Sequence, residues 1–590
     1  MAEGLGYGRL TEMARNCLLL GRTALRHAVD DPMLLVVQSA RRMPPRLRAP
    51  TARLIGLGTP GGPSIRAAFA QFVADLPHEA TTLLASAAPP RTALGRRLAG
   101  ELAVELGSAQ SIPGGLAAAP PATQARWAWR RGDISDAITL TGDSATGLRY
   151  RARLVSERAM MQPGFRLSST GHPECRERPP RPSGPRALHV LTNSVPHTTS
   201  GYTIRSHAIL RALLDQGVPV EAVTRIGYPV TVGRPLARTV DVVGGVRYRR
   251  ILAAGAGSTP AERLEQMVRR TLGVAEVFHP TLLHTTTNYT NALVTEAVAR
   301  ALGLPWVYEV RGQLEKTWLA SLPMPDREAA AQSERYTLLR AKETELMLAA
   351  DHVVALSETL REDLLERGVP AGRIAVVPNA VDSSLVDFRL EPAQARASVG
   401  LPVEGFWVGT VSSLVDYEGL DALIDAVAEL RREGLDVRVA LVGDGVSRPA
   451  LQARAARQGL GRAAVLPGRV ASGEAPLWHR ALDVFVVPRR DVDVCRAVTP
   501  LKPMEAMAAG RPVIATDLPA LAEIVARPGT GVMVPPGDVT ALAAAIRSLA
   551  SDPVARATYG DRGREFAATR TWAAQGRLYG ALYESLTVPA

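Results

Sequence analysis

Short apolar runs alternate with longer amphipathic segments from about residue 187 to residue 377. The runs have the length of strands, and the segments between them repeat their apolar positions with helical spacing. Strands that alternate with helices predict βαβ units and therefore a parallel sheet. The predicted strands are 187–192, 218–224, 282–284, 306–310, 353–356 and 374–377, and the predicted helices are 202–217, 291–302, 326–350 and 358–367.

The same alternation restarts near residue 405. Two separate runs predict two Rossmann-like, doubly wound α/β domains. Because open sheets of this kind bind ligands at the carboxyl ends of their strands, we expect a site in the cleft between two facing domains. The strands of the second run are predicted at 406–411, 437–442, 465–468, 484–488 and 512–515, and its helices at 419–433 and 504–509.

Residues 1–170 differ in composition: they are rich in Ala, Arg and Leu and are interrupted by Pro-containing breaks. This pattern predicts a mainly helical extension of short amphipathic helices. Segments 125–138 and 149–161 could form one helical-hairpin repeat, but ordinary helices packed on one another explain them as well. Residues 171–186 hold five prolines and many charges, which predicts an exposed, stiff linker.

The chain is basic, with a net charge of +12 and a pI near 10. All but three of the basic residues are arginine, which favours arginine scattered over a solvated surface rather than a patch for a polyanion. No basic run alternates with aromatic residues, so we expect no nucleic-acid partner. The three lysines are Lys316, Lys342 and Lys502.

The three cysteines lie far apart and form no CxxC pair, which argues against a zinc site and fits a reduced compartment. The N-terminus has no signal-peptide pattern, and its apolar stretch 17–21 is too short to span a bilayer. We therefore expect a cytoplasmic protein. Peripheral attachment to the inner face of the membrane stays open.

Two loops that follow predicted strands of the first domain carry candidate chemistry. Residues 193–203 form a turn with Gly201 and Tyr202 at the start of a helix, where backbone N–H groups are available to an anion. The turn is not GxGxxG, which argues against a nicotinamide oxidoreductase. Glu309 and Arg311 lie on one side of a strand end and are expected to face the cleft. An ordinary loop and a local ion pair are the alternatives.

The strongest candidate is the segment 496–515 of the second domain. Lys502 stands just before a predicted helix, and Glu505 lies in its first turn. Positive potential at that point suits a diphosphate, and a carboxylate one turn further can accept hydrogen bonds from a ribose diol. Simple complementarity with the helix dipole is the alternative for Glu505. A lysine kept in an arginine-rich chain indicates that a compact ammonium is needed.

With these residues in place, the chain resembles the retaining glycosyltransferases of family 4, which have the GT-B fold. The likeness covers about residues 187–585, and the branch with YEVRG and TPLKPxEAMA motifs is the most similar. Several motifs support it in the right order: Gly201, Val377 to Asp382, Gly409, Leu441 to Gly445, Gly468 to Val470, Pro500 to Ala515 and Gly531 to Asp538.

The resemblance implies roles for these residues. Glu505 would hold the donor ribose, and the backbone of Leu501 and Lys502 would meet the diphosphate. Arg311 would lie near the reacting sugar, so that Arg311, Lys502 and Glu505 are the expected catalytic residues. The remaining donor-binding residues would be Gly201 and Tyr202 by the phosphates and acceptor, Arg469 and Val470 by the base, and Arg496 as a further cation.

The resemblance also implies the reaction and the domain plan. A sugar would pass, with retention, from a UDP- or GDP-linked donor to a glycan, lipid-linked or small-molecule acceptor. Cationic side chains, helix ends and loop amides would stabilise the leaving group without a metal, and Asp491-Val492-Asp493 is interpreted as a loop. The expected units are 1–170, the linker 171–186, an acceptor domain 187–385, a donor domain 386–572 and a C-terminal helix 573–590 packed back on the acceptor domain.

Two departures from the family pattern favour an alternative. Ala497 stands where most members carry a glutamate, and the loop 412–418 lacks the basic residues that members usually have there. A catalytically impaired binding or assembly module is therefore the second hypothesis. In that case the N-terminal helices would be a protein-interaction module.

Overall fold

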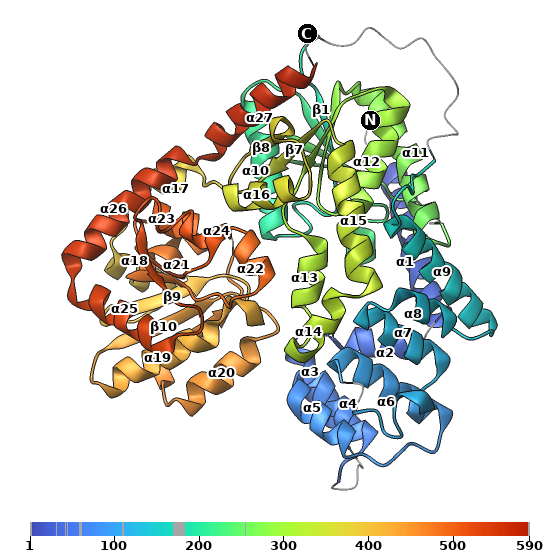
Figure 1. The fold of residues 1–590 in the computed structure, drawn as a ribbon, viewed down its shortest axis with the longest axis horizontal. Coiled ribbons are helices and arrows are strands. Elements are labelled where there is room, and N and C mark those ends of the chain that lie inside the picture. Colours follow the sequence, from blue (N-terminus) through green and yellow to red (C-terminus); the bar gives the residue numbers. More distant parts are fainter. Residues whose placement is uncertain are drawn as a thin grey trace.

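The computed structural model describes residues 3–587, except for 31, 42, 44, 58–61, 109–110, 169–182, 254, 256 and 472. It has three parts: an N-terminal helical region and two α/β lobes (Figure 1). The predicted fold class, two parallel-sheet lobes preceded by a helical extension, is confirmed. Most of the predicted linker, 171–182, lies outside the described residues.

The first lobe contains an eight-stranded sheet of order β3-β4-β2-β1-β5-β6-β7-β8. All neighbours pair in parallel except the hairpin of β3 and β4 at one edge. The central strands are buried along their whole length because helices cover both faces of the sheet. The strands are β1 (Ala187–Leu191), β2 (Val220–Thr224), β3 (Val240–Val243), β4 (Val246–Arg250), β5 (Leu282–Thr286), β6 (Trp306–Glu309), β7 (His352–Ala355) and β8 (Ile374–Val376).

The helices of the first lobe include one correction. The continuous helix predicted at 326–350 is wrong, because two helices occupy the segment. The break falls at Ser333, whose hydroxyl accepts a hydrogen bond from the N–H of Tyr336 and so caps the second helix. The helices are α10 (Gly201–Asp215), α11 (Pro260–Phe278), α12 (Tyr289–Leu302), α13 (Leu314–Ala320), α14 (Met324–Ala331), α15 (Glu334–Ala349) and α16 (Glu358–Glu366).

The second lobe contains a six-stranded, wholly parallel sheet of order β11-β10-β9-β12-β13-β14. Apolar clusters cover both of its faces. Its strands are β9 (Phe406–Val411), β10 (Val437–Val442), β11 (Ala464–Gly468), β12 (Val484–Val487), β13 (Val513–Thr516) and β14 (Gly531–Val534). Its helices include α19 (Leu420–Arg432), α20 (Arg448–Arg457), α21 (Ala475–Ala481), α22 (Asp493–Ala497), α23 (Lys502–Ala508), α24 (Pro519–Ala522), α25 (Val539–Ser551) and α26 (Pro553–Thr569).

The last helix, α27 (Trp572–Thr587), leaves the second lobe and packs on α10 of the first (Figure 1). The approach is close: a Cβ added at Gly576 would lie 2.7 Å from the Cβ of Ala212. The hydroxyl of Tyr583 lies 2.7 Å from His284 Nδ1, deep in the first lobe. The chain therefore ties the two lobes together at its end as well as at the crossing after β8.

The N-terminal helices pack on one another and on the first lobe. The amide of Asn16 donates to the carbonyls of Pro235 and Ala237, and α9 lies against α11 and α15. No helix in the described part is both long and apolar enough to cross a bilayer. The helices are α1 (Glu3–Asp30), α2 (Pro32–Arg41), α3 (Pro45–Gly56), α4 (Ile65–Val73), α5 (Pro77–Ala85), α6 (Ala93–Leu106), α7 (Pro121–Arg131), α8 (Ile134–Thr139) and α9 (Ala145–Met161).

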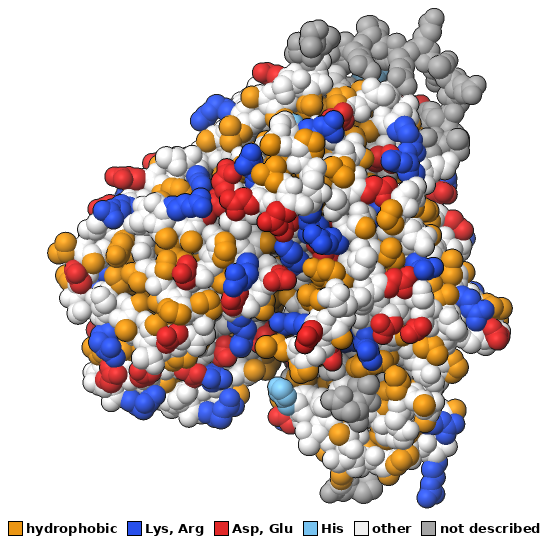
Figure 2. Space-filling model, in the orientation of Figure 1, with side chains coloured by type: hydrophobic (Ala, Val, Ile, Leu, Met, Phe, Trp, Pro, Cys, Tyr) orange, Lys and Arg blue, Asp and Glu red, His pale blue; other side chains and the backbone are white. Residues whose placement is uncertain are grey.

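Charged side chains of both signs are interspersed over the face of the molecule seen in Figure 2. Many arginines are paired with carboxylates, for example Arg547 with Glu433 and Arg438 with Asp436. On this face, the positive net charge is therefore spread out rather than gathered into one patch.

Candidate functional site

The second lobe contributes an ion pair at the start of α23. The ammonium of Lys502 donates to Glu505 Oε2 at 3.0 Å, which is the i, i+3 contact that helical spacing allows. Both side chains are partly exposed, 29% for Lys502 and 17% for Glu505. The other carboxylate oxygen, Oε1, accepts no hydrogen bond from the residues that the structure describes. That oxygen is available to a ligand.

His479, on α21, is the third member of this cluster and was not predicted. Its Nε2 lies 3.0 Å from Glu505 Oε2. Burial lowers the pKa of His479, so the ring is neutral near pH 7 and donates Nε2–H to the carboxylate. Burial alone would raise the pKa of Glu505, but the His479 hydrogen bond and the Lys502 charge outweigh it and lower that pKa to about 2. Glu505 is therefore a permanent anion held in one orientation.

The first lobe contributes the predicted turn at Gly201 and Tyr202. Ser200 and Thr203 form a capping box that starts α10 at Gly201. Tyr202 is 56% exposed, and a Cβ placed at Gly312 would lie 3.4 Å from its hydroxyl and 3.9 Å from Val498 of the second lobe. The Tyr202 ring thus lies where the two lobes approach each other, a region that we call the interlobe seam.

Glu309 and Arg311 lie on one side of the strand end, as predicted, and form the ion pair that was the alternative interpretation. Their predicted position facing the cleft is wrong. Glu309 is fully buried and Arg311 is 4% exposed. The Arg311 guanidinium donates to Glu309 Oε2 at 2.7 Å, to the carbonyl of Tyr202 at 2.8 Å and to Ser206 Oγ at 2.7 Å. Arg311 therefore supports the Tyr202 turn from behind.

Glu309 is the centre of a larger buried network. Besides Arg311 it binds Arg205 Nε at 2.7 Å and lies 3.3 Å from His284 Nε2. Burial would raise the pKa of Glu309, but the two guanidiniums and His284 hold it well below its usual range. The carboxylate therefore stays ionised inside the lobe, as a buried charge does only when it is paired.

This network reaches the second lobe through Asn379. The Arg205 guanidinium donates to the carbonyl of Val377 at 2.7 Å and to the side chain of Asn379 at 3.2 Å. Asn379 in turn donates to the carbonyl of Thr499 at 2.9 Å, three residues before Lys502. The turn at Tyr202 and the loop before Lys502 are thus connected by continuous hydrogen bonds.

A second contact closes the seam at α16. Glu523, just after α24, is 7% exposed and its Oε2 accepts hydrogen bonds from the backbone N–H groups of Glu358 at 3.1 Å and Thr359 at 3.4 Å. A side chain of the second lobe therefore caps a helix of the first.

The other predicted residues lie around α23 or on the surface. Leu501 directly precedes α23 as its N-cap. Arg469 is exposed and Val470 half-buried, both just after β11. Arg496 forms an exposed pair with Asp491, at 2.6 Å between Nη2 and Oδ2. In the described part, no three His, Cys, Asp or Glu side chains are grouped so that they could hold a metal ion.

Arg489 is a further buried cation that the motif search missed. It follows β12, donates to both oxygens of Glu418 at 2.8 and 3.1 Å and to the carbonyl of Val498 at 2.9 Å. It thereby places a guanidinium beside the loop 412–418, which has no base of its own. Its position at the carboxyl end of a predicted strand, the criterion that selected Arg311, would have found it.

Comparison with known proteins accounts for both lobes. Residues 200–380 match the model described as glycosyl transferase 4-like domain, and residues 405–552 match glycosyl transferases group 1. Together the two matches cover more than half of the 590 residues. The chain belongs to the GT-B glycosyltransferases.

Individual relatives of this glycosyltransferase support the same assignment. The chain is 29% identical over 394 residues to D-inositol 3-phosphate glycosyltransferase 2 of Catenulispora acidiphila, covering 63% of this chain and 87% of that protein. It is 28% identical over 264 residues to the 2-deoxystreptamine glucosyltransferase of Streptomyces kanamyceticus, covering 44% of this chain and 65% of that protein, just under two thirds of its length. The Anabaena protein HepE, solved in complex with UDP, superposes with a TM-score of 0.53 at 18% identity, over 68% of this chain and all of HepE, which concerns the fold alone.

Proposed function

We propose that this glycosyltransferase moves a sugar from a UDP- or GDP-linked donor to a glycan, lipid-linked or small-molecule acceptor, with retention of the anomeric configuration. One observation carries the proposal: Lys502 and Glu505 are charged, oriented and partly exposed directly beside the interlobe seam. A free Glu505 Oε1 suits the two hydroxyls of a ribose, and the Lys502 ammonium suits the diphosphate. The complex of HepE with UDP is in keeping with a nucleotide donor.

In this proposal the chemical step needs stabilisation of the charge that develops on the departing diphosphate. Lys502 and the backbone amides at Leu501 and Lys502 supply it, and Arg311 acts by holding the Tyr202 turn in place. Arg469 and Val470 contact the base. Gly201 and Tyr202 lie between the donor phosphates and the acceptor, and Arg496 is a peripheral cation. No metal is required, so excess chelator leaves turnover unchanged.

The test is a turnover assay with UDP- and GDP-linked sugars on the full chain. Lys502→Ala and Glu505→Ala are each expected to lower kcat/KM about 100- to 1,000-fold while the thermal midpoint stays within a few degrees. The matched controls are Arg547→Ala and Glu433→Ala, which break an exposed ion pair between α25 and α19. Activity near wild type in either α23 variant contradicts the proposal, and an inverted product anomer in the NMR spectrum contradicts retention.

A catalytically impaired binding module is the second candidate. It is favoured by Ala497, which is buried where the family usually carries a glutamate, and by the pairing of Lys502, Arg311 and Arg496 with carboxylates. Calorimetric titration with UDP and GDP separates the two candidates. Nucleotide binding with turnover supports the transferase, and the absence of both favours the module.

A further inference from the structure

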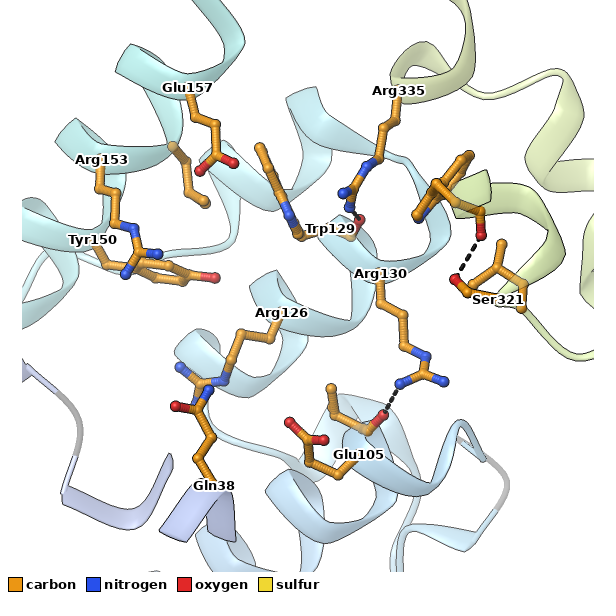
Figure 3. Close-up of a pocket in the computed structure, with 14 residues that line it drawn as sticks. Gln38, Glu105, Arg126, Trp129, Arg130, Tyr150, Arg153, Glu157, Ser321 and Arg335 are labelled. Atoms are coloured by element: carbon orange, nitrogen blue, oxygen red, sulfur yellow. Dashed lines mark hydrogen bonds between the residues drawn. The ribbon is translucent and has the colours of Figure 1, made fainter. Parts of the chain in front are cut away.

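A cavity of about 550 Å³ lies where the helical extension meets the first lobe (Figure 3). Its walls come from α2, α6, α7 and α9 of the extension and from α13 and α15 of the lobe, with the turn after α13. The volume falls within the range of about 300–1,000 Å³ typical of small-molecule sites. The extension lies outside both matched glycosyltransferase domains, whereas α13 and α15 lie inside the first of them.

One wall holds a half-buried arginine, Arg335, with an unused and buried donor. The Arg335 guanidinium carbon lies 5.5 Å from the ring centre of Trp129 and 5.0 Å from that of Trp318. Its Nη1 donates to the carbonyl of Trp129 at 3.3 Å, but its buried Nε has no partner among the described residues. A buried donor without an acceptor costs free energy, and a shift of the side chain toward a ligand oxygen would remove that cost.

Another part of the wall, on α9, holds an unused acceptor. The half-buried carboxylate of Glu157 accepts no hydrogen bond from the described residues, and burial raises its pKa against the charges of Arg153, Arg335 and Arg263. Figure 3 shows Glu157 and Arg153 extending from α9 beside the Tyr150 ring. Burial raises the pKa of Tyr150 to about 12, so its phenol keeps its proton and can both donate and accept.

The mixture of groups selects the class of ligand. Four arginines, Arg126, Arg130, Arg153 and Arg335, attract an anion, although Arg126 is already paired with Glu101. Glu105 and Glu157 in the same cavity repel an anion, and a cation meets the reverse. A hydroxyl group suits both kinds of side chain, because it donates to a carboxylate and accepts from a guanidinium. The Trp129 and Tyr150 rings provide apolar surface for the C–H faces of a sugar ring. We propose that the cavity binds a neutral saccharide.

The position of the cavity indicates which saccharide unit it holds. Its wall includes Trp318 and Ser321, in and just after α13, and α13 begins two residues beyond Gly312 at the interlobe seam. Seven helical residues span about 10 Å, the reach of a short oligosaccharide. Resting on the proposed function, the inference is that the cavity holds the non-reacting end of an acceptor glycan and so orients the reacting end at the seam.

The test is saturation-transfer NMR on the full chain with maltose, cellobiose, lactose and diacetylchitobiose as probes. At least one disaccharide is expected to bind. Glu157→Gln, which keeps the shape but weakens the acceptor, should raise its Kd roughly tenfold. Ser321→Trp, at an exposed residue of the wall, should abolish binding by filling the cavity without disturbing the core. Glu328→Gln, the same change at an exposed carboxylate of α14, is the matched control and should bind as wild type.

Three results overturn the inference: no disaccharide binds although UDP does, the saccharide signals are unchanged in both cavity variants, or inorganic pyrophosphate binds in place of the saccharides and is lost in Ser321→Trp. A further result separates the inference from the proposed function. If a disaccharide binds in the cavity but neither UDP nor GDP binds anywhere, the saccharide site stands, whereas its acceptor role and the proposed function both fail.

Discussion

Each lobe contains a glutamate held by a histidine and by a cationic side chain, but the two clusters differ in exposure. In the second lobe Glu505 contacts His479 and Lys502, and in the first lobe Glu309 contacts His284, Arg205 and Arg311. Both carboxylates have lowered pKa values. Glu505 keeps an oxygen for a ligand, whereas Glu309 is wholly enclosed. The same chemistry therefore serves a ligand in one lobe and the internal structure in the other.

The largest effect that this comparison predicts is on stability in the first lobe. Glu309→Ala leaves two buried guanidiniums without a counter-charge, and we expect a loss of about 3–5 kcal/mol in the free energy of unfolding. Urea denaturation followed by circular dichroism measures it. Glu505→Ala is the matched change in the exposed cluster and should cost clearly less. An equal cost in both variants contradicts the division of roles.

The two histidines allow each cluster to be tested separately, because His479 contacts Glu505 and His284 contacts Glu309. His479→Ala removes a hydrogen bond to the Glu505 carboxylate and is expected to weaken UDP binding roughly tenfold, in addition to the stability loss that truncating a buried side chain brings. His284→Ala removes contacts to Glu309 and Tyr583 inside the first lobe and should lower the thermal midpoint while UDP affinity stays the same. Calorimetric titration and thermal melts on both variants measure the two effects. Weaker UDP binding in His284→Ala but not in His479→Ala would contradict the different roles given to the two clusters.

The pH dependence of stability tests the ionisation of Glu505, with a smaller expected effect than the substitutions above. Because the pKa of Glu505 falls from 4.5 to about 2 on folding, its ionisation stabilises the fold above about pH 4.5, and this contribution is lost as the pH falls toward 2. The stability difference between wild type and Glu505→Gln should therefore be constant around neutral pH and shrink below about pH 4.5. Urea titrations at several pH values measure it. A difference that is unchanged at about pH 3 contradicts the role of the ion pair.

The smallest predicted effect concerns the contact between the lobes. Glu523→Gln weakens the cap that the second lobe places on α16, and we expect a loss of about 0.5–1 kcal/mol in the free energy of unfolding. Glu358→Gln is the control, because the side chain of Glu358 pairs with Arg361 of the same helix and only its backbone N–H contacts Glu523. Hydrogen exchange at the amides of Glu358 and Thr359 measures local opening, which should speed up in Glu523→Gln alone.

Much of the fold could be predicted because βαβ units have a strong local pattern. Predicted strands such as 187–192 and 437–442 coincide with β1 and β10 to within a residue or two. The β3–β4 hairpin was missed, although its turn, Gly244-Gly245, has positive φ at both residues and is a known hairpin signal. The continuous helix 326–350 failed because its apolar spacing continues across the cap at Ser333.

In the candidate site, too, contacts set by local spacing could be predicted and contacts between distant segments could not. Lys502 and Glu505 were recognised together because three residues of helix bring them into contact. His479 escaped because it lies 26 residues from Glu505 and has no motif of its own. For Glu309 and Arg311, strand spacing predicted that both side chains lie on one side but not that they are buried, since α27 and the Tyr202 turn close over them.

By itself, then, the sequence determined the alternation of strands and helices, the restart at residue 405, and the pairs of residues that share one turn of helix or one side of a strand. These follow from local geometry, in which spacing along the chain sets direction in space. Only the tertiary structure decided which carboxylate is enclosed, how Asn379 joins Thr499 across 120 residues, and where the extension leaves a cavity. Those outcomes depend on packing between distant segments, and no local pattern encodes them.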